Sequence, residues 1–454
     1  MDALQQLKQP ELNLETAPQV RTDFSSEAFI AKRLAESPTG QVRLLESILE
    51  RTNMRTALRR VLSNDGAPGV DGMTCRQLCG YLKRCWPTIR QALLDGTYTP
   101  QPVKRCEIPK PDGGVRLLGI PAALDRLIQQ AVAQVLTHLW DHTFSDSSHG
   151  FRPGRSQRGA LTQCRAHVQA GYRVAVDLDL SKFFDRVNHD RLMSRLAARI
   201  ADKRVLRLIR RYLTSGVMIG GLVEATDEGT PQGGPLSPLL SNIVLDELDR
   251  ELENRNLHFV RYADDCVIYV KSIRAGERVM ASVTRFIEKR LRLKVNRDKS
   301  AVGRPWDRKY LGMCTTNSRT APKLRIHWKS IQRFKQRVRE LTCRTRGRSV
   351  PYVIGELMTY INGWWNYYGI TESFNRLKPL AHWVRRRLRA LIWYQWKNYR
   401  TRVRELKKRG VRHREALLAG CARKGAWRMS KTYWVNIALP DDDFTSLGLV
   451  FPWT

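Results

Sequence analysis

The 454-residue sequence lacks the features of several protein classes. It contains no apolar run of the length that crosses a bilayer, which argues against a transmembrane protein. Its first twenty residues have neither a basic segment nor an apolar one, so they do not form a secretory signal. The nine cysteines include no CxxC pair and no Cys/His zinc spacing, and we interpret them as reduced thiols of a cytosolic protein.

Acidic residues are also scarce. The chain has 43 Asp and Glu against 79 Lys and Arg, a formal net charge of +36. Residues 323–431 contain 29 Lys and Arg but only 5 Glu and no Asp, and nine of the twelve tryptophans lie at or beyond Trp328. Such an excess predicts a polyanionic partner, because basic and aromatic residues together suit phosphates and stacked bases. The alternative is a solvated helical face above a tryptophan-rich core.

Residue patterns divide the chain into three regions. Residues 1–40 are polar with little periodicity. Residues 41–320 alternate helical stretches, such as "LDRLIQQAVAQVLTHLW", with strand-like runs, such as "YRVAVDLDL", which is typical of a mixed α/β domain. Helical pattern dominates beyond residue 320, most clearly in "HWVRRRLRALIWYQWKNYRTRVRELKKRG". The sequence therefore predicts an α/β region followed by an α-helical one.

Two stretches carry aspartates that one sheet could bring together. In "HFVRYADDCVIYVKS", Asp264 and Asp265 separate two strand-like runs, and two adjacent like charges cost stability without a partner. In "YRVAVDLDLSKFFDRVNHDRL", strand alternation places Asp177 and Asp179 on the face opposite the apolar residues. One interpretation of the doublet is a tight solvated turn. The other is a site for two Mg²⁺ ions about 3.5–4 Å apart, which would stabilise the attacking and leaving oxygens of a phosphoryl transfer.

Further motifs accompany these aspartates. "IPKPDGGVRLLGIP" (108–121) predicts a hairpin with a Pro-Asp-Gly-Gly turn. "GTPQGGPLSPLLSNIVLDELDREL" (229–252) is a Gly/Pro-rich loop that opens a helix, where backbone can approach a base pair closely. "LKVNRDKS" (293–300) contributes a lysine, and "KYLGM" (309–313) has the pattern of a short strand.

In this order, the motifs resemble those of group II intron-encoded reverse transcriptases and maturases, over roughly residues 50–435. "GAPGVDGMT" (66–74) resembles the first motif of that family, and "SHGFRPGRSQRGAL" (148–161) its extended fingers region. "YINGWWNYYGI" (360–370) resembles the signature of the maturase or thumb domain, and "GCARKGAWRMSKTYW" (420–434) the end of a short DNA-binding segment.

The resemblance implies a fold and a domain order. We expect a polar N-terminal extension over 1–40, and the fingers and palm of a right-hand polymerase fold over 41–320. A helical thumb or maturase domain would follow over 321–410, and a short basic DNA-binding segment over 411–454. The chain stops at "LVFPWT", where many relatives continue into a His- and Cys-rich endonuclease domain. We therefore expect that it does not cleave the second target strand by its own chemistry.

The resemblance also implies roles for single residues. Asp264 and Asp265 match the paired aspartates of the YxDD turn, and Asp179, not Asp177, fits the pattern Asp-x-x-x-x-aromatic-Asp that ends at Asp185. These three aspartates are the implied catalytic residues and, with Leu180, the implied ligands of two Mg²⁺ ions, replaceable by Mn²⁺ in vitro. The implied nucleotide-binding residues are Lys110, Arg116, Phe184, Gln232 and Lys299, and the implied nucleic-acid contacts are Trp364, Trp365, Arg385, Arg386 and Arg387.

Several of these roles have plainer alternatives. Phe184 matches the aromatic gate beneath the nucleotide sugar, but it could be a core residue beside Phe183. Lys299 could be an ordinary surface lysine. Trp364 and Trp365 could pack in a helical bundle rather than contact RNA.

Three function classes are consistent with this sequence. The first is an RNA-directed DNA polymerase that also assists splicing and mobility of its host intron, in a bacterial cytoplasmic ribonucleoprotein without a membrane. Its partners would be group II intron RNA or another RNA template, a primer–template duplex, target DNA and deoxynucleotides. The second is an intron-independent reverse transcriptase used in DNA repair or phage defence. The third is a non-enzymatic RNA splicing factor, against which the intact aspartate trio argues.

Overall fold

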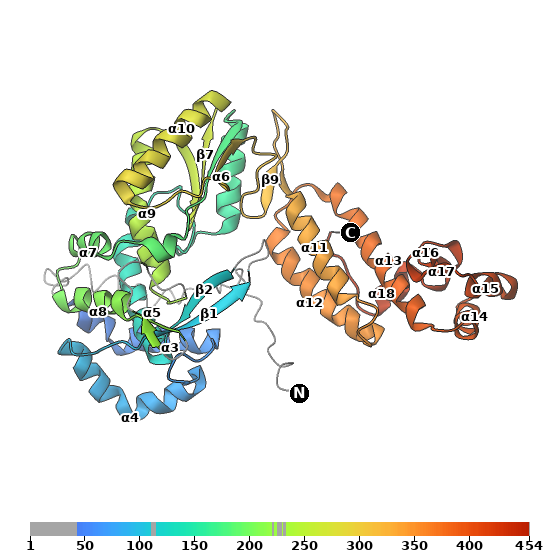
Figure 1. Cartoon of the computed structure of the whole chain (residues 1–454), viewed down its shortest axis with the longest axis horizontal. Helices are drawn as coiled ribbons and strands as arrows, with labels where there is room; N and C mark the ends of the chain where they lie inside the picture. Colours follow the sequence, from blue (N-terminus) through green and yellow to red (C-terminus); the bar gives the residue numbers. More distant parts are fainter. Residues whose placement is uncertain (1–42, 110–114, 220–221, 225–228, 230–232, 454) are drawn as a thin grey trace. The chain divides into compact units, whose positions relative to one another are not determined.

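A computed structural model of the chain describes residues 43–453, except 110–114, 220–221, 225–228 and 230–232. It divides the chain into two compact units, Met1–Arg304 and Pro305–Thr454 (Figure 1). The predicted polar extension over residues 1–40 lies outside the described residues. No helix in the described part of the chain is both long and apolar enough to cross a membrane. All nine cysteines are free thiols.

Helices begin the described part of the first unit. Helix α4 (Cys75–Leu94) starts at a capping box. The Thr74 side chain accepts a hydrogen bond from the backbone N–H of Gln77, and the Gln77 side chain accepts one from the backbone N–H of Thr74. The predicted helix "LDRLIQQAVAQVLTHLW" is confirmed as α5, most of whose residues are buried. The helices of this part are α2 (Leu44–Ile48), α3 (Arg51–Asn64), α4 (Cys75–Leu94) and α5 (Ala123–Trp140).

The first sheet has the strand order β2-β1-β4-β5. Its strands are β1 (Val103–Pro109), β2 (Val115–Ile120), β4 (Val217–Ile219) and β5 (Leu222–Glu224). Strands β1 and β2 pair antiparallel from Lys104↔Ile120 to Pro109↔Val115, which confirms that the stretch predicted as a hairpin pairs in this way. Its predicted Pro-Asp-Gly-Gly turn lies outside the described residues.

The second sheet has the order β6-β7-β3-β8, and its neighbouring strands are all antiparallel. Its strands are β3 (Val174–Leu178), β6 (His258–Tyr262), β7 (Asp265–Val270) and β8 (Ala301–Gly303). The predicted strand over "YRVAVDLDL" and the predicted strand pair around "YADD" are both confirmed. Helices α7 (His189–Ala197) and α8 (Lys203–Thr214) join the core of this unit.

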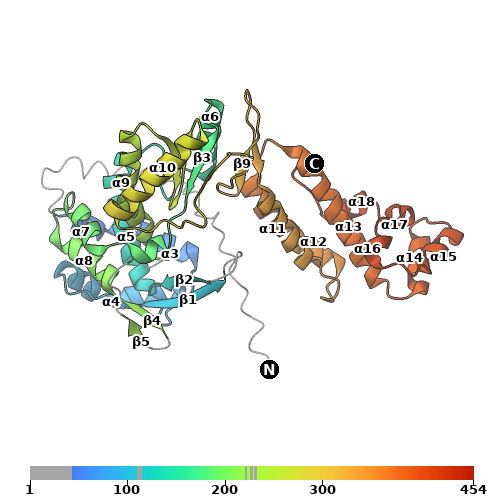
Figure 2. The ribbon, with the colours of Figure 1, turned by 45° about the horizontal axis from the view of Figure 1, so that its top comes forward.

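Helices cover both faces of this second sheet (Figures 1 and 2). On the apolar face, a Cβ added to Gly276 of α10 (Ile273–Phe286) would meet Val174, Val176 and Val302, so this helix packs closely on β3 and β8. Helix α9 (Ser237–Asn254), which follows the Gly/Pro-rich loop as predicted, contacts the same face through Asp249. Helix α6 (Gln157–Gln169) packs on the opposite face, where His167 lies against Tyr269.

The second unit is mainly helical, as predicted. It starts with a two-stranded ribbon of β9 (Met313–Thr315) and β10 (Leu324–Ile326). The prediction of a strand over 309–313 was wrong. Leu311 and Gly312 have φ values of 47° and 77°, so the chain turns there and the strand starts only at Met313.

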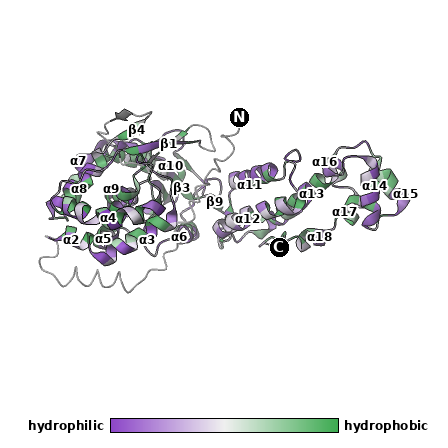
Figure 3. Cartoon of the chain, turned by 90° about the horizontal axis from the view of Figure 1, so that it is seen from below, coloured by the Kyte–Doolittle hydropathy of each residue, from purple (hydrophilic) through white to green (hydrophobic). Residues whose placement is uncertain are grey.

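The helices of the second unit are amphipathic. In Figure 3, α11 is drawn largely in the hydrophilic colour, while Phe334 and Val338 of the same helix are fully buried. The long basic stretch at 382–410 forms two helices rather than one. The first ends at Gln395, and the second starts at Tyr399. The helices are α11 (Trp328–Leu341), α12 (Val350–Tyr368), α13 (Lys378–Gln395), α14 (Tyr399–Lys408), α15 (His413–Gly420), α16 (Ala426–Met429), α17 (Tyr433–Ala438) and α18 (Asp441–Ser446).

Candidate active site

Strand register brings two of the predicted catalytic aspartates together. Strands β3 and β7 pair antiparallel, and the last pair in the register is Leu178↔Cys266. Because antiparallel register advances by one residue on each strand, the next position sets Asp179 opposite Asp265. Side chains at opposite positions point to the same face, with Cβ atoms about 4.5–5.5 Å apart. Asp179 and Asp265 therefore share one end of the α6 face of the sheet.

The third aspartate lies in the turn between β6 and β7. Tyr262 pairs with Asp265, so only Ala263 and Asp264 form the loop of this hairpin. Ala263 is buried and has a φ of 57°, a conformation that is uncommon for a residue with a side chain. Asp264 is half-buried and Asp265 is exposed. The doublet therefore lies in a tight turn, as one of the two interpretations of the adjacent charges held, although only Asp265 is exposed.

The backbone around Asp179 is held by the segment that contains the "LKVNRDKS" motif. The N–H of Asp179 donates to the Ser300 hydroxyl at 3.0 Å, and its carbonyl accepts from the N–H of Asn296 at 2.8 Å. Leu180, which is buried, forms a bridge with Val295. Lys299 is exposed and is the neighbour of Ser300 in the chain, so its motif lies alongside the strand end.

The aspartates match a divalent cation in donor chemistry. Carboxylate oxygens are the ligands that Mg²⁺ prefers. Three carboxylates, those of Asp179, Asp264 and Asp265, come from the ends of two neighbouring strands and from the turn. Within the described ranges, however, no three His, Cys, Asp or Glu side chains are grouped closely enough to hold a metal ion. The aspartates therefore fit a divalent cation in the type of their donor atoms and in their position along the strands, but they do not form a preformed cluster. Asp177, which is half-buried near the end of β3, pairs with Val267 and Ala301 and lies two residues before Asp179.

The two adjacent phenylalanines after the catalytic strand have different environments. Lys182 has a φ of 50°, which ends the extended chain before a short 3₁₀ turn, η2 (Phe183–Arg186). Phe183 is 2% exposed and belongs to the core. Phe184 is only half-buried, and its ring packs edge-on against Phe183 with the centroids 5.2 Å apart. This difference suits the assignment of Phe184, rather than Phe183, to the nucleotide pocket.

The other predicted nucleotide contacts are only partly described. Lys110 and Gln232 lie outside the described residues, and so does the side chain of Arg116, whose backbone is in β2. The loop that contains Gln232 nevertheless reaches the hairpin. Gly233 has a φ of 123°, and a Cβ added there would lie 2.5 Å from the carbonyl oxygen of Gly119, so only glycine fits this close approach.

The predicted aromatic contacts of the second unit lie in or near its core. Trp364 is 8% exposed, and its ring centroid lies 4.7 Å from that of Phe334 and 5.6 Å from that of Trp453. Trp365 is half-buried and lies 5.5 Å from Trp453. This packing favours the alternative that Trp364 stabilises the bundle.

The three consecutive arginines of α13 are half-buried and have partners within the second unit. Part of their effect on RNA binding would therefore come through the stability of the unit. Arg385 forms an ion pair with Asp441 at 3.2 Å, Arg386 donates to the carbonyl of Trp427 at 3.1 Å, and Arg387 donates to the hydroxyl of Thr342 at 2.6 Å.

A basic cluster around Trp383 was missed by the sequence reasoning. The cationic groups of Lys335, Arg339 and Arg387 lie 5.6–5.9 Å from the centre of its ring. Burial, and then the charges of Arg339 and Arg344, lower the pKa of Arg387. In the described part of the chain, Lys335, Arg339 and Arg344 form no ion pair with an acidic side chain, so the cluster is strongly electropositive. The i, i+4 spacing of 335/339 and of 383/387 is the signal that could have found it.

Comparison with known proteins agrees with this architecture. Residues 108–315 match the family "Reverse transcriptase (RNA-dependent DNA polymerase)", and residues 331–410 match "Group II intron, maturase-specific domain". The chain is 34% identical over 300 residues to Protein YkfC of Escherichia coli K12, covering 57% of this chain and 79% of that protein. It is 37% identical over 220 residues to the group II intron-encoded protein LtrA of Lactococcus lactis subsp. cremoris, covering 48% of this chain and 36% of that protein.

Among solved structures, a chain of the "Partial Cas6-RT-Cas1--Cas2 complex" is similar, with a TM-score of 0.35 and 26% identity over 54% of this chain and 42% of that chain. Because this structural similarity is weak, the assignment depends on the sequence matches. The first match contains the aspartate strand and the "YADD" turn, and the second covers most of the basic helical unit. The chain belongs to the group II intron-type reverse transcriptases, with an RNA-dependent DNA polymerase domain followed by a maturase-specific domain.

Proposed function

We propose that the whole chain acts as an RNA-directed DNA polymerase through Asp179, Asp264 and Asp265. The observation that carries the proposal is the strand register, whose last pair, Leu178↔Cys266, lies directly beside Asp179 and Asp265 and close to the turn that holds Asp264, inside the reverse transcriptase match. The reaction is the attack of a primer 3′-hydroxyl on the α-phosphate of an incoming deoxynucleotide.

Asp179, Asp264, Asp265 and Leu180 would hold two Mg²⁺ ions, which when bound supply the positive charge that stabilises the transferred phosphate. The chain itself contributes orientation. Ser300 and the backbone of Asn296 fix the end of the catalytic strand. Phe184 would lie under the sugar of the nucleotide, and Lys110, Arg116, Gln232 and Lys299 would contact its phosphates and base. In phosphoryl transfer, such positioning and electrostatic stabilisation provide most of the catalysis.

We further assign the parts of a polymerase hand to the chain. Residues 41–320 would provide the fingers and palm, residues 321–410 the thumb or maturase domain, and residues 411–454 the basic DNA-binding segment, so the first of these domains would extend slightly beyond the first compact unit, which ends at Arg304. The maturase-specific match over residues 331–410 supports a role in binding group II intron RNA for splicing and mobility. The Trp383 cluster supports it too, because cations gathered around an aromatic ring suit phosphates and stacked bases.

The test is primer extension on an RNA template with Mg²⁺. Asp264→Asn keeps the size of the side chain but removes its charge. We expect the extension rate to fall by about 10²-fold or more, the scale expected when one electrostatic partner of a transition state is removed. RNA affinity should stay within about twofold, because the basic surface that binds the phosphate backbone is unchanged.

Asp177→Asn is the matched control, since Asp177 lies on the same strand and face as Asp179. It should extend the primer at the wild-type rate. Normal extension by Asp264→Asn would refute the proposed site. A wild-type protein that binds RNA tightly but does not extend any primer would instead favour a non-enzymatic splicing factor.

A further inference from the structure

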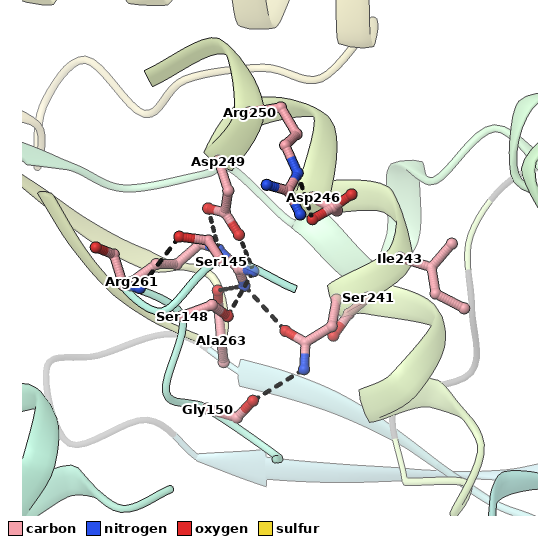
Figure 4. Close-up of polar contacts among 12 residues, drawn as sticks. Ser145, Ser148, Gly150, Ser241, Ile243, Asp246, Asp249, Arg250, Arg261 and Ala263 are labelled. Carbon is pink, nitrogen blue, oxygen red and sulfur yellow. Dashed lines mark hydrogen bonds and ion pairs between the residues drawn. The ribbon is translucent and has the colours of Figure 1, made fainter. Parts of the chain in front are cut away.

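A buried arginine lies directly behind the "YADD" turn. Arg261 is in β6, two residues before Ala263, and its side chain is 0% exposed. It forms an ion pair with Asp249 of α9, whose side chain is also 0% exposed (Figure 4). Arg261 lies two residues after Phe259 in β6, so both side chains are on the apolar face of the sheet, and Arg261 pairs with Cys266 of β7. The charge therefore lies within the hydrophobic layer between the sheet and α9.

All five N–H donors of this guanidinium have an acceptor. Two of them donate to Asp249, two to other side chains, and one to the backbone of the turn. The acceptors are Asp249 Oδ1 at 2.7 Å, Asp249 Oδ2 at 2.5 Å, Asn242 Oδ1 at 2.9 Å, Ser148 Oγ at 2.7 Å and the carbonyl oxygen of Ala263 at 2.9 Å.

A second layer of contacts fixes the loop that contains "SHGFRPG" against the same turn. The Asn242 amide donates to the carbonyl of Gly150 at 2.9 Å. A Cβ added to Gly150 would lie 2.2 Å from the backbone nitrogen of Ala263, so glycine is required for this approach. The backbone of Arg261 also exchanges hydrogen bonds with residues 147 and 149 of this loop. Three separate segments of the chain thus meet at the turn (Figure 4).

Stability alone does not account for this arrangement. Moving two charges out of water is costly, and a buried ion pair can often be replaced by well-packed apolar residues without loss of stability. Burial by itself would lower the pKa of Arg261, but the Asp249 carboxylate raises it, so the guanidinium stays charged. What an apolar pair could not supply is a donor to the Ala263 carbonyl, in a turn whose backbone conformation is itself strained.

We propose that Arg261, oriented by Asp249, is a positioning residue that fixes the Ala263 carbonyl and thereby the direction in which the turn presents Asp264 and Asp265. This inference rests on the proposed function, because it assigns a role to the turn that carries the catalytic carboxylates. The guanidinium contacts neither substrate nor metal. It acts through the backbone, and small displacements of catalytic groups can reduce turnover by as much as about 10²-fold.

The decisive variant is the double substitution Arg261→Met with Asp249→Leu, which removes both buried charges together and leaves neither of them unpaired. It should fold with a lower thermal unfolding midpoint than the wild type, because Met is smaller than Arg and the acceptors on Asn242, Ser148 and Ala263 lose their donor. We expect kcat for primer extension to fall about 10- to 100-fold and the Mg²⁺ concentration for half-maximal rate to rise several-fold. The KM for deoxynucleotide and the RNA affinity should stay within about twofold.

Arg261→Lys provides a second test that does not depend on how the double variant folds. A lysine keeps the charge beside Asp249 but has three donors in place of five, so it cannot serve all the acceptors of Arg261. It should change kcat and the Mg²⁺ requirement in the same direction. Arg204→Met is the structural control, since Arg204 bonds Glu46 and Asp202 in the helical part of the first unit. That variant should unfold at lower temperature with unchanged kcat.

Each outcome bears on one inference or the other. Folded Arg261 variants with wild-type kcat and Mg²⁺ requirement would overturn the positioning role, and so would a similar loss of kcat in Arg204→Met. Both of these results would overturn only the positioning role. The proposed function would remain intact as long as the wild type extends primers and Asp264→Asn does not. If Asp264→Asn extends primers normally, the proposed function fails and the positioning role fails with it.

Discussion

A buried carboxyl at the start of α5 makes the stability of the first unit depend on pH. Asp125 is 1% exposed, accepts a hydrogen bond from the Tyr98 hydroxyl at 2.7 Å and another from the N–H of Gln101 at 3.1 Å. Burial raises the pKa of Asp125 from 3.8 to about 6, against the effect of these hydrogen bonds. The other ionisable groups that act on it are Tyr98, Tyr212 and Asp71. Burial and Asp125 raise the pKa of Tyr98, so this tyrosine stays neutral over the relevant range.

The size of the effect follows from linkage between protonation and folding. A shift from 3.8 to about 6 is about 2 pKa units, and at about 1.36 kcal/mol per unit it corresponds to ~3 kcal/mol. Because the folded-state pKa is the higher one, this stability is fully present below pH 3.8 and is lost as the pH rises through about 6. Roughly 1 kcal/mol of the loss falls between pH 5 and pH 7, where the comparison is practical.

Asp125→Asn should remove this pH dependence, because the amide does not ionise. Its oxygen can still accept from Gln101, and its NH₂ group can donate to the Tyr98 oxygen. The measurement is urea unfolding of the full chain, monitored with a probe in the first unit. We expect the difference in free energy of unfolding, variant minus wild type, to increase by roughly 1 kcal/mol from pH 5 to pH 7. Parallel pH profiles for the two proteins would show that Asp125 titrates near its ordinary pKa when folded, and would refute the reasoning.

Two further predictions concern the nucleotide pocket and the basic surface. Phe184→Val should raise incorporation of ATP relative to dATP by about 10-fold or more, since a smaller side chain leaves room for a 2′-hydroxyl, whereas Phe183→Ala should mainly destabilise the fold, by about 3–5 kcal/mol. Single-nucleotide extension measures the ratio, and an unchanged ratio in folded Phe184→Val would place the gate elsewhere. Replacing Lys335, Arg339 and Arg344 by alanine should reduce the slope of log RNA affinity against log salt by about 0.7–0.9 for each phosphate that the variant no longer neutralises. A slope that does not move would identify the cluster as a solvated face.

The elements of the catalytic sheet could be predicted because their side chains alternate. Valines and leucines on one face of residues 174–180, with Asp177 and Asp179 on the other, describe a half-buried strand without any knowledge of its neighbours. The pairing of this strand with β7 could not be obtained in the same way. Register depends on contacts between residues far apart in the chain, and only the structure shows that β3 and β7 pair as far as Leu178↔Cys266, next to Asp179 and Asp265.

Other features were missed because local patterns do not record packing partners. "KYLGM" has the composition of a strand, yet the left-handed backbone at Leu311 and Gly312 makes it a turn. The sequence left open whether Trp364 contacts RNA or packs in the bundle, and the structure shows its ring against Phe334 and Trp453. Residues 385–387 were expected to contact nucleic acid, and the sequence did not show that each of them has a partner in the same unit.

The burial of Arg261 could have been predicted from the strand pattern. In "HFVRY", strand alternation places Arg261 on the same face as Phe259, which is the apolar face. A charged residue at such a position requires a buried partner of opposite charge. Asp249, on a helix whose other inward positions are mostly leucine, is the complementary signal. The two together indicate a buried ion pair, although the sequence does not say that its fifth donor reaches the turn.

The placement of this ion pair is related to the charges that it supports. Asp264 and Asp265 are adjacent in the turn, and repulsion between carboxylates favours any movement of the backbone that separates them. A turn of two residues with an alanine at positive φ has little intrinsic resistance to such movement, since that conformation is itself unfavourable. Contacts with the backbone of the turn supply such resistance. Arg261 provides a hydrogen bond to Ala263, and Gly150 is in direct backbone contact with it. The cost of burying a charge in the core is thus incurred directly behind the turn that carries the proposed catalytic aspartates.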